Sequence, residues 1–187
     1  MTATHWYVIT GAPSSGKTTL LRELEKAGYR VVHEVARAII QSELARGRTL
    51  KEIRADKRFF ENGILEAKIA IEATLAKHDV IFFDRGIPDS IAYFQVSGLD
   101  PATAKAKSPS DHYRKIFLLD QLPYERDHVR IEESGTAAEL DSALERSYRE
   151  LGYVVQRIGA MPVRDRLRII LDALGNDRYT GRQSKTR

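Results

Sequence analysis

A glycine-rich stretch close to the N-terminus constrains this chain more than any other feature. It reads Gly11-Ala12-Pro13-Ser14-Ser15-Gly16-Lys17-Thr18, with an apolar run from Trp6 to Ile9 before it and apolar residues at helical spacing after it. A strand, a glycine-rich loop and a helix in this order, with the spacing G-x-x-x-x-G-K-[ST], are typical of a P-loop. The fold therefore has to place a buried strand and a helix N-terminus around one anion site.

Each residue type in this motif has a physical role in binding a triphosphate. Gly11 and Gly16 lack side chains, so backbone N–H groups can approach an anion closely. Lys17 adds a charge that can reach the β- and γ-phosphates, and Thr18 offers a hydroxyl to Mg²⁺. The sequence lacks the N/T-K-x-D motif of guanine-specific proteins, so we expect ATP, with GTP possible, together with Mg²⁺. The residues expected at the nucleotide are Gly11, Ala12, Pro13, Ser14, Ser15, Gly16, Lys17, Thr18 and Thr19.

Strands alternate with helices five times along the chain. The apolar patterns predict strands at 6–10, 29–33, 80–83, 116–119 and 153–158, and helices at about 16–27, 35–46, 50–57, 59–77, 88–96, 101–107, 137–151 and 163–174. This pattern predicts an α/β domain of three layers, a P-loop NTPase fold with a five-stranded parallel sheet. We expect one domain over 1–175, with a lid at about 121–136 and a basic, flexible tail at 176–187.

Composition excludes several classes of protein. The chain is 42% hydrophobic and 30% charged, which is typical of a globular domain, and no apolar run approaches the ~20 residues of a membrane span. There are no cysteines and no secretory signal pattern at the N-terminus, so we expect a cytoplasmic protein. The net charge of +4 is concentrated after Gly175, where Tyr179 is the one aromatic residue, so nucleic-acid binding is not expected. The sequence does not indicate an oligomeric state.

Further candidates lie directly after the predicted strands, where ligands bind in parallel α/β sheets. Asp84 follows four apolar residues, and in P-loop proteins such an aspartate holds the Mg²⁺ shell; the alternative is a helix-capping role. Arg85 stands where a hydrolysing motor is expected to have a glutamate. It is a candidate to bind an acceptor or a phosphate, and the alternative is a surface salt bridge.

Glu34, at the end of the second strand, is the candidate general base for an attacking hydroxyl; the alternative is that it caps the next helix. Arg37, one turn further on, could face the same pocket. Arg126 and Arg130 are four residues apart in the lid segment, so one helical face could present both to a transferred phosphoryl group. The alternative for them is a solvated charge run.

With these residues assembled, the sequence resembles the P-loop kinase-like family of AAA-type ATP-binding proteins related to the NadR-type ribosylnicotinamide kinase domain. The resemblance is carried by residues 9–19, 33–37, 83–90 and 125–133. It implies a nucleoside- or nucleotide-kinase-like fold and a Mg²⁺–nucleotide site. By this resemblance the nucleotide site includes Gly16, Lys17, Thr18 and Asp84, the acceptor pocket includes Glu34, Arg37, Arg85 and Asp89, and the lid carries Arg126 and Arg130.

Two functions follow as hypotheses. The first is a kinase that transfers the γ-phosphoryl group of ATP to a hydroxyl of a nucleoside-like or other small metabolite. Its catalytic residues would be Lys17, Glu34, Arg85, Arg126 and Arg130. The alternative is a nucleotide-dependent regulatory NTPase, a GTP- or ATP-binding switch with a protein or lipid partner.

Overall fold

A parallel sheet of five strands forms the centre of the computed structural model, which describes residues 4–123 and 134–183. The strand order is β2-β3-β1-β4-β5, and every neighbouring pair runs parallel. This arrangement confirms the predicted α/β fold class. The strands are β1 (Trp6–Thr10), β2 (Arg30–Val32), β3 (Ile81–Asp84), β4 (Lys115–Leu119) and β5 (Val155–Ile158).

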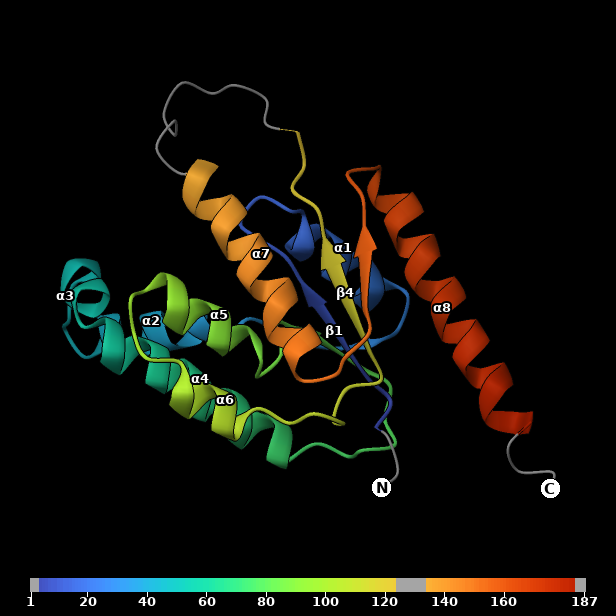
Figure 1. Ribbon diagram of the computed structural model, residues 1–187, viewed down its shortest axis with the longest axis horizontal. Coiled ribbons are helices and arrows are strands. Elements are labelled where there is room, and N and C mark those ends of the chain that lie inside the picture. Colours follow the sequence, from blue (N-terminus) through green and yellow to red (C-terminus); the bar gives the residue numbers. More distant parts are fainter. Residues whose placement is uncertain (1–3, 124–133, 184–187) are drawn as a thin grey trace.

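Helices connect the strands and cover both faces of the sheet (Figure 1). They are α1 (Lys17–Lys26), α2 (Val35–Ala45), α3 (Leu50–Ala55), α4 (Lys57–Ala73), α5 (Asp89–Val96), α6 (Ala102–Lys107), α7 (Ser134–Glu150) and α8 (Val163–Gln183). Among the residues that the structure describes, none of these helices has both the length and the apolar composition of a membrane span.

The two faces of the sheet bury different residues of the same strands. In β1, Trp6 and Val8 face one side, where they pack with apolar residues of α5 and α7. Tyr7 and Ile9 face the other side and pack with α1 and α8. This alternation follows from the two-residue period of a strand, and because both faces are covered all five residues of β1 are buried.

Some boundaries differ from those the sequence predicts. The strand β3 includes Asp84, because the ladder with β1 continues to the pair Ile9–Asp84. The helix α7 begins at Ser134, within the range predicted for the lid. The helix α8 continues to Gln183, well beyond the predicted end at Leu174. The prediction followed the apolar residues, which pack against the sheet as far as Leu174, whereas the helical backbone continues beyond them.

The parallel arrangement brings the predicted site residues to one edge of the sheet. The register pairs Ile9 with Asp84 and Val32 with Phe83, so β1, β2 and β3 end side by side. The P-loop follows β1, Glu34 lies just after β2, and Arg85 follows β3. Glu34 and Arg85, which are 51 residues apart in sequence, therefore meet at this edge.

Candidate functional site

The P-loop between β1 and α1 has the backbone geometry that an anion site requires. Gly11 has φ 147° and Gly16 has φ 80°, and a Cβ atom on Gly11 would lie 2.5 Å from the carbonyl oxygen of Leu119. Ser14 also has a positive φ, 62°, which is uncommon for a residue with a side chain. Gly16 is the N-cap of α1, and neither a capping side chain nor an acidic first-turn residue covers this helix end. Its N–H groups and positive dipole end are thus directed at the loop.

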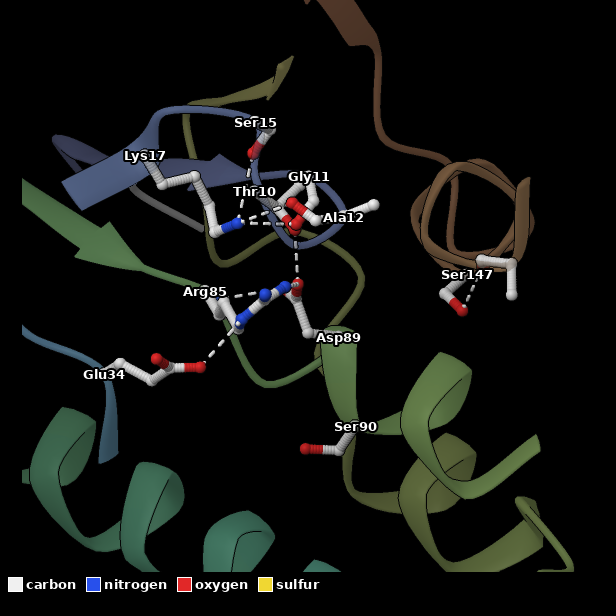
Figure 2. A network of polar contacts seen from close by, with 12 residues as sticks. Thr10, Gly11, Ala12, Ser15, Lys17, Glu34, Arg85, Asp89, Ser90 and Ser147 are labelled. Atoms are coloured by element: carbon white, nitrogen blue, oxygen red, sulfur yellow. Dashed lines mark hydrogen bonds and ion pairs between the residues drawn. The ribbon is translucent and has the colours of Figure 1, made fainter. Parts of the chain in front are cut away.

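Lys17 is buried and folds back onto the loop that precedes it (Figure 2). Its Nζ donates hydrogen bonds to the carbonyl oxygens of Gly11 at 2.7 Å and Ala12 at 3.0 Å, and to Oγ of Ser15 at 3.1 Å. Burial, assisted by the positive charge of Arg85, lowers the pKa of Lys17 to about 7. The ammonium is bound here by neutral oxygens alone, so an arriving phosphate would offer it a stronger partner.

Asp84 and Thr18 provide oxygen ligands suited to Mg²⁺. Asp84 is 7% exposed, and its buried Oδ1 has no hydrogen-bond partner among the described residues. Burial raises the pKa of this carboxyl group. The side chain of Thr18 is exposed in the first turn of α1. No group of three or more His, Cys, Asp and Glu side chains could hold a metal within residues 4–123 and 134–183. One carboxylate and one hydroxyl are nevertheless what Mg²⁺ commonly takes from a protein when phosphates and water complete its shell.

Arg85 lies at the centre of a charged network next to the P-loop (Figure 2). Its Nε donates to Oε1 of Glu34 at 3.1 Å, and its Nη1 lies 3.5 Å from Oδ1 of Asp89. Its guanidinium lies 5.0 Å from the ring centre of Tyr93. Burial by itself lowers the pKa of Arg85, but Tyr93 and the carboxylates around it outweigh burial and raise the pKa above its ordinary value. Arg85 therefore remains charged although it is 7% exposed.

The backbone of Arg85 adopts a left-handed conformation, with φ 71°. A non-glycine residue pays a steric cost there, and such conformations concentrate at functional sites. The amide of Arg85 donates to the carbonyl oxygen of Ile9 at 3.1 Å, which attaches the strained residue to β1. Figure 2 shows the side chain of Arg85 between Glu34 and Asp89, next to the P-loop.

Glu34 is the N-cap of α2, but its side chain makes no capping hydrogen bond. The carboxylate instead pairs with Arg85, and the side chain is 38% exposed. The geometry is thus against the capping alternative and leaves part of the carboxylate open to a ligand. Arg37 is exposed on α2 and has no hydrogen bond or ion pair with another residue in the described part of the chain.

Asp89 does not face the open part of the site. It is fully buried and accepts hydrogen bonds from Oγ1 of Thr10, from the hydroxyl of Tyr148 and from the amide of Gly86 at 2.9 Å. Both of its carboxylate oxygens are therefore used inside the protein. This arrangement does not fit the direct acceptor contact that the sequence suggests for Asp89. It fits a residue that holds Arg85 from behind.

Buried polar groups from segments distant in sequence fix the loop after β3. The hydroxyl of Tyr113 accepts from the amide of Ile87 at 2.8 Å, and Nζ of Lys68 donates to the carbonyl oxygen of Gly86 at 2.8 Å. A Cβ atom on Gly86 would lie 2.8 Å from the hydroxyl oxygen of Tyr148, so only glycine fits here without displacement. Sequence reasoning missed these residues because Lys68 and Tyr148 are single polar side chains in amphipathic helices and Tyr113 lies in a connection, and neither context carries a local signal.

Of the predicted lid at 121–136, the structure describes only the two ends, 121–123 and 134–136. Arg126 and Arg130 lie outside the described residues. Before that gap, Nε2 of Gln121 donates to the carbonyl oxygen of Pro13 at 2.9 Å, and the amide of Leu122 donates to that of Ser14 at 3.2 Å. The segment after β4 therefore leaves the sheet directly over the P-loop.

Comparisons with known proteins agree with this geometry. The model of a family described as AAA domain matches residues 6–166. A search of curated proteins finds no match. Similar solved structures include thymidylate kinase from Candida albicans, with a TM-score of 0.60 and 14% identity over 94% of this chain and 93% of that one. They also include deoxyadenosine kinase from M. mycoides with bound dATP, with a TM-score of 0.59 and 16% identity over 91% and 98%.

A third similar structure is the NadR protein in complex with NR. Its TM-score is 0.52 and its identity 21%, over 81% of this chain and 45% of the NadR chain. At these identities the likeness establishes the fold that the chains share. This shared fold agrees with the kinase-like resemblance of the motifs, but it does not identify the acceptor.

Proposed function

Because the chain belongs to the AAA domain family, whose model matches residues 6–166, we propose that it is a small-molecule kinase. It binds ATP with Mg²⁺ and transfers the γ-phosphoryl group to a hydroxyl of a nucleoside-like or other small metabolite. The observation that carries the proposal is the pair Glu34–Arg85 at the sheet edge that also holds the P-loop. A phosphate cradle and a partly exposed carboxylate close together are the two halves of a phosphoryl-transfer site. The kinase folds of the similar solved structures support the proposal.

On the nucleotide side, the chain supplies backbone amides, one cation and two metal ligands. The N–H groups of the P-loop and the first turn of α1 bind the phosphate oxygens, and Lys17 moves from its carbonyl partners to the β- and γ-phosphates. Thr18 and Asp84 would hold Mg²⁺, which neutralises phosphate charge when bound. The orphaned Oδ1 of Asp84 is the feature of this chain that fits such an ion.

On the acceptor side, Glu34 accepts the proton as the hydroxyl oxygen attacks the γ-phosphorus. One P–O bond forms to the acceptor while the bond to the β–γ bridging oxygen breaks, and ADP leaves. Arg85 orients the Glu34 carboxylate through Nε and leaves guanidinium N–H groups for the acceptor or the transferred group. Arg37 on α2 remains a prediction for the acceptor pocket, and Arg126 and Arg130 remain predictions for the lid. Asp89 is a positioning residue that sets the direction of Arg85.

The experiment measures ADP formation from ATP, and separately from GTP, with a panel of nucleosides and other hydroxylated metabolites. Mass spectrometry then identifies any phosphorylated product. The proposal expects one acceptor class to raise turnover above the water background. Glu34→Gln should lower kcat on that acceptor by about 100-fold, the usual contribution of a general base, while nucleotide binding remains.

Glu150→Gln is the matched control, because Glu150 ends α7 and its ion pair among the described residues is an exposed one with Lys105. This variant should turn over like the wild type. If no acceptor raises turnover and Glu34→Gln changes nothing, the kinase proposal fails. Tight nucleotide binding with slow hydrolysis would then favour the regulatory switch.

A further inference from the structure

The mechanism above makes no use of Arg166, a buried arginine in the first turns of α8. Its side chain is 2% exposed, in a helix whose neighbouring arginines, Arg164 and Arg168, are exposed. Arginine is rarely buried to this degree unless it is paired. Its burial therefore needs an explanation beyond the packing of α8.

The guanidinium of Arg166 contacts three separate loops of the site edge. Its Nη1 donates to the carbonyl oxygen of Ser15 in the P-loop. Its Nη2 donates to the carbonyl oxygen of Asp120 after β4 at 3.1 Å, and its Nε to that of Gly159 after β5 at 3.0 Å. One planar group thus fixes the P-loop against the ends of two other strands.

The charge of Arg166 has no anionic partner within residues 4–123 and 134–183. All three of its hydrogen-bond acceptors are neutral carbonyl groups. The nearest acidic influence is Asp120, whose carboxylate is already paired with Arg157 at 2.7 Å. Burial lowers the pKa of Arg166, but a guanidinium stays protonated in proteins. A buried cation without a counter-charge is costly unless an anion completes the site.

The position of this charge indicates which anion it would serve. A Cβ atom built on Gly16 would lie 3.5 Å from Nη1 of Arg166, so the guanidinium lies directly beside the N-cap of α1. The anion-binding amides of the P-loop start at this same residue. Arg166 therefore adds a full charge next to the partial charge of the helix end.

We infer that Arg166 is a positioning residue for the nucleotide phosphates, which fixes the P-loop through Ser15 and supplies a permanent positive charge behind it. This inference rests on the nucleotide half of the proposed function and does not depend on the acceptor. The charge is part of the role, so a lysine at this position should keep much of the effect. A role limited to hydrogen bonding would need the planar guanidinium, whose fixed N–H directions a lysine ammonium cannot reproduce.

The test measures nucleotide binding by calorimetry without any acceptor. Arg166→Met, Arg166→Lys and the control Arg168→Met are compared with the wild type for Mg-ATP, Mg-ADP and inorganic tripolyphosphate. Arg168 is a matched control because it lies on the same helix, with its side chain 71% exposed. Arg166→Met should weaken Mg-ATP and tripolyphosphate by about tenfold or more, as loss of a charged hydrogen-bonding group does. At pH 6, where a buried lysine still carries its charge in most molecules, the affinity of Arg166→Lys should lie between those of the wild type and Arg166→Met, and that of Arg168→Met should stay within about twofold of the wild type.

A second readout is the salt dependence of Mg-ATP affinity, which should be shallower in Arg166→Met because one fixed charge is missing. Wild-type affinity in a folded Arg166→Met variant overturns the inference. If Arg166→Met does not fold, Arg166→Gln takes its place, because it keeps N–H donors toward the P-loop and loses the charge. A loss of about tenfold in Mg-ATP affinity then supports the inference, and wild-type affinity overturns it. A wild type that binds Mg-ATP but phosphorylates no acceptor defeats the kinase proposal alone, so the two failures are distinguishable.

Discussion

Lys17 should take up a proton when the nucleotide binds. In the free protein its Nζ is buried against three neutral oxygens, and burial lowers its pKa to about 7. A bound phosphate stabilises the charged form and raises the pKa in the complex. At pH 8 about 0.9 of the free molecules carry a neutral lysine and must gain a proton on binding; at pH 6 the fraction is about 0.1.

The sign of the pH dependence follows from these two states. The pKa of Lys17 is higher in the complex than in the free protein, so affinity is fully present below pH 7 and declines as the pH rises through that value. Between the two pKa values the decline should approach about tenfold per pH unit. Above the pKa of the complex the affinity should level off.

Calorimetry in buffers of different ionisation enthalpy measures this uptake directly, at saturating Mg²⁺. Lys17→Arg is the control, because arginine stays charged at every pH used and its uptake should be near zero. The nucleotide's own titration is the same in both proteins and cancels in the comparison. Equal proton uptake by the wild type and Lys17→Arg at pH 8 would refute the reasoning.

Three further substitutions test the packing behind the site. Gly86→Ala brings a Cβ atom to 2.8 Å from the hydroxyl oxygen of Tyr148, so urea unfolding should show a loss of about 1–3 kcal/mol and phosphoryl transfer should fall with it. Asp89→Asn replaces one carboxylate oxygen by an NH₂ group where Thr10, Gly86 and Tyr148 all donate, so the free energy of unfolding should fall by about 1–3 kcal/mol in the same assay. Unchanged stability would contradict this hydrogen-bond network. Leu144→Ala removes a fully buried side chain between α7 and the sheet and should lower the free energy of unfolding by about 2–5 kcal/mol. The control Val154→Ala, at a 78% exposed position, should change the free energy of unfolding by less than about 0.5 kcal/mol. Equal losses of stability in the two variants would argue against this core.

Local sequence patterns predicted the elements because each pattern has a short-range cause. The apolar run in β3 predicts a strand covered on both faces, and all four residues of β3, Ile81–Asp84, are buried. The predicted Asp84 and Arg85 lie at the edge that also holds the P-loop, as the topology of parallel sheets requires. The end of α8 differs from the prediction, because the helix continues past the point where its apolar period ends.

The roles of Asp89 and Arg166 could not be read in the same way. An aspartate five residues after a strand looks the same in sequence whether it faces a ligand or the protein interior. Its partners Thr10 and Tyr148 lie 79 and 59 residues away. Arg166 is one arginine among several in α8, and its contact with Ser15 spans 151 residues. Only the folded chain shows which side chains are buried together.

The sequence by itself determined that a phosphate-binding loop follows the first strand of a parallel α/β sheet, because that motif depends on residues adjacent in the chain. Tertiary structure alone decided which charges surround it. Burial and pairing, which set whether a side chain holds a ligand or holds another residue, depend on strands and helices brought together from the whole chain. The loop is thus a property of eight consecutive residues, and the site is a property of the fold.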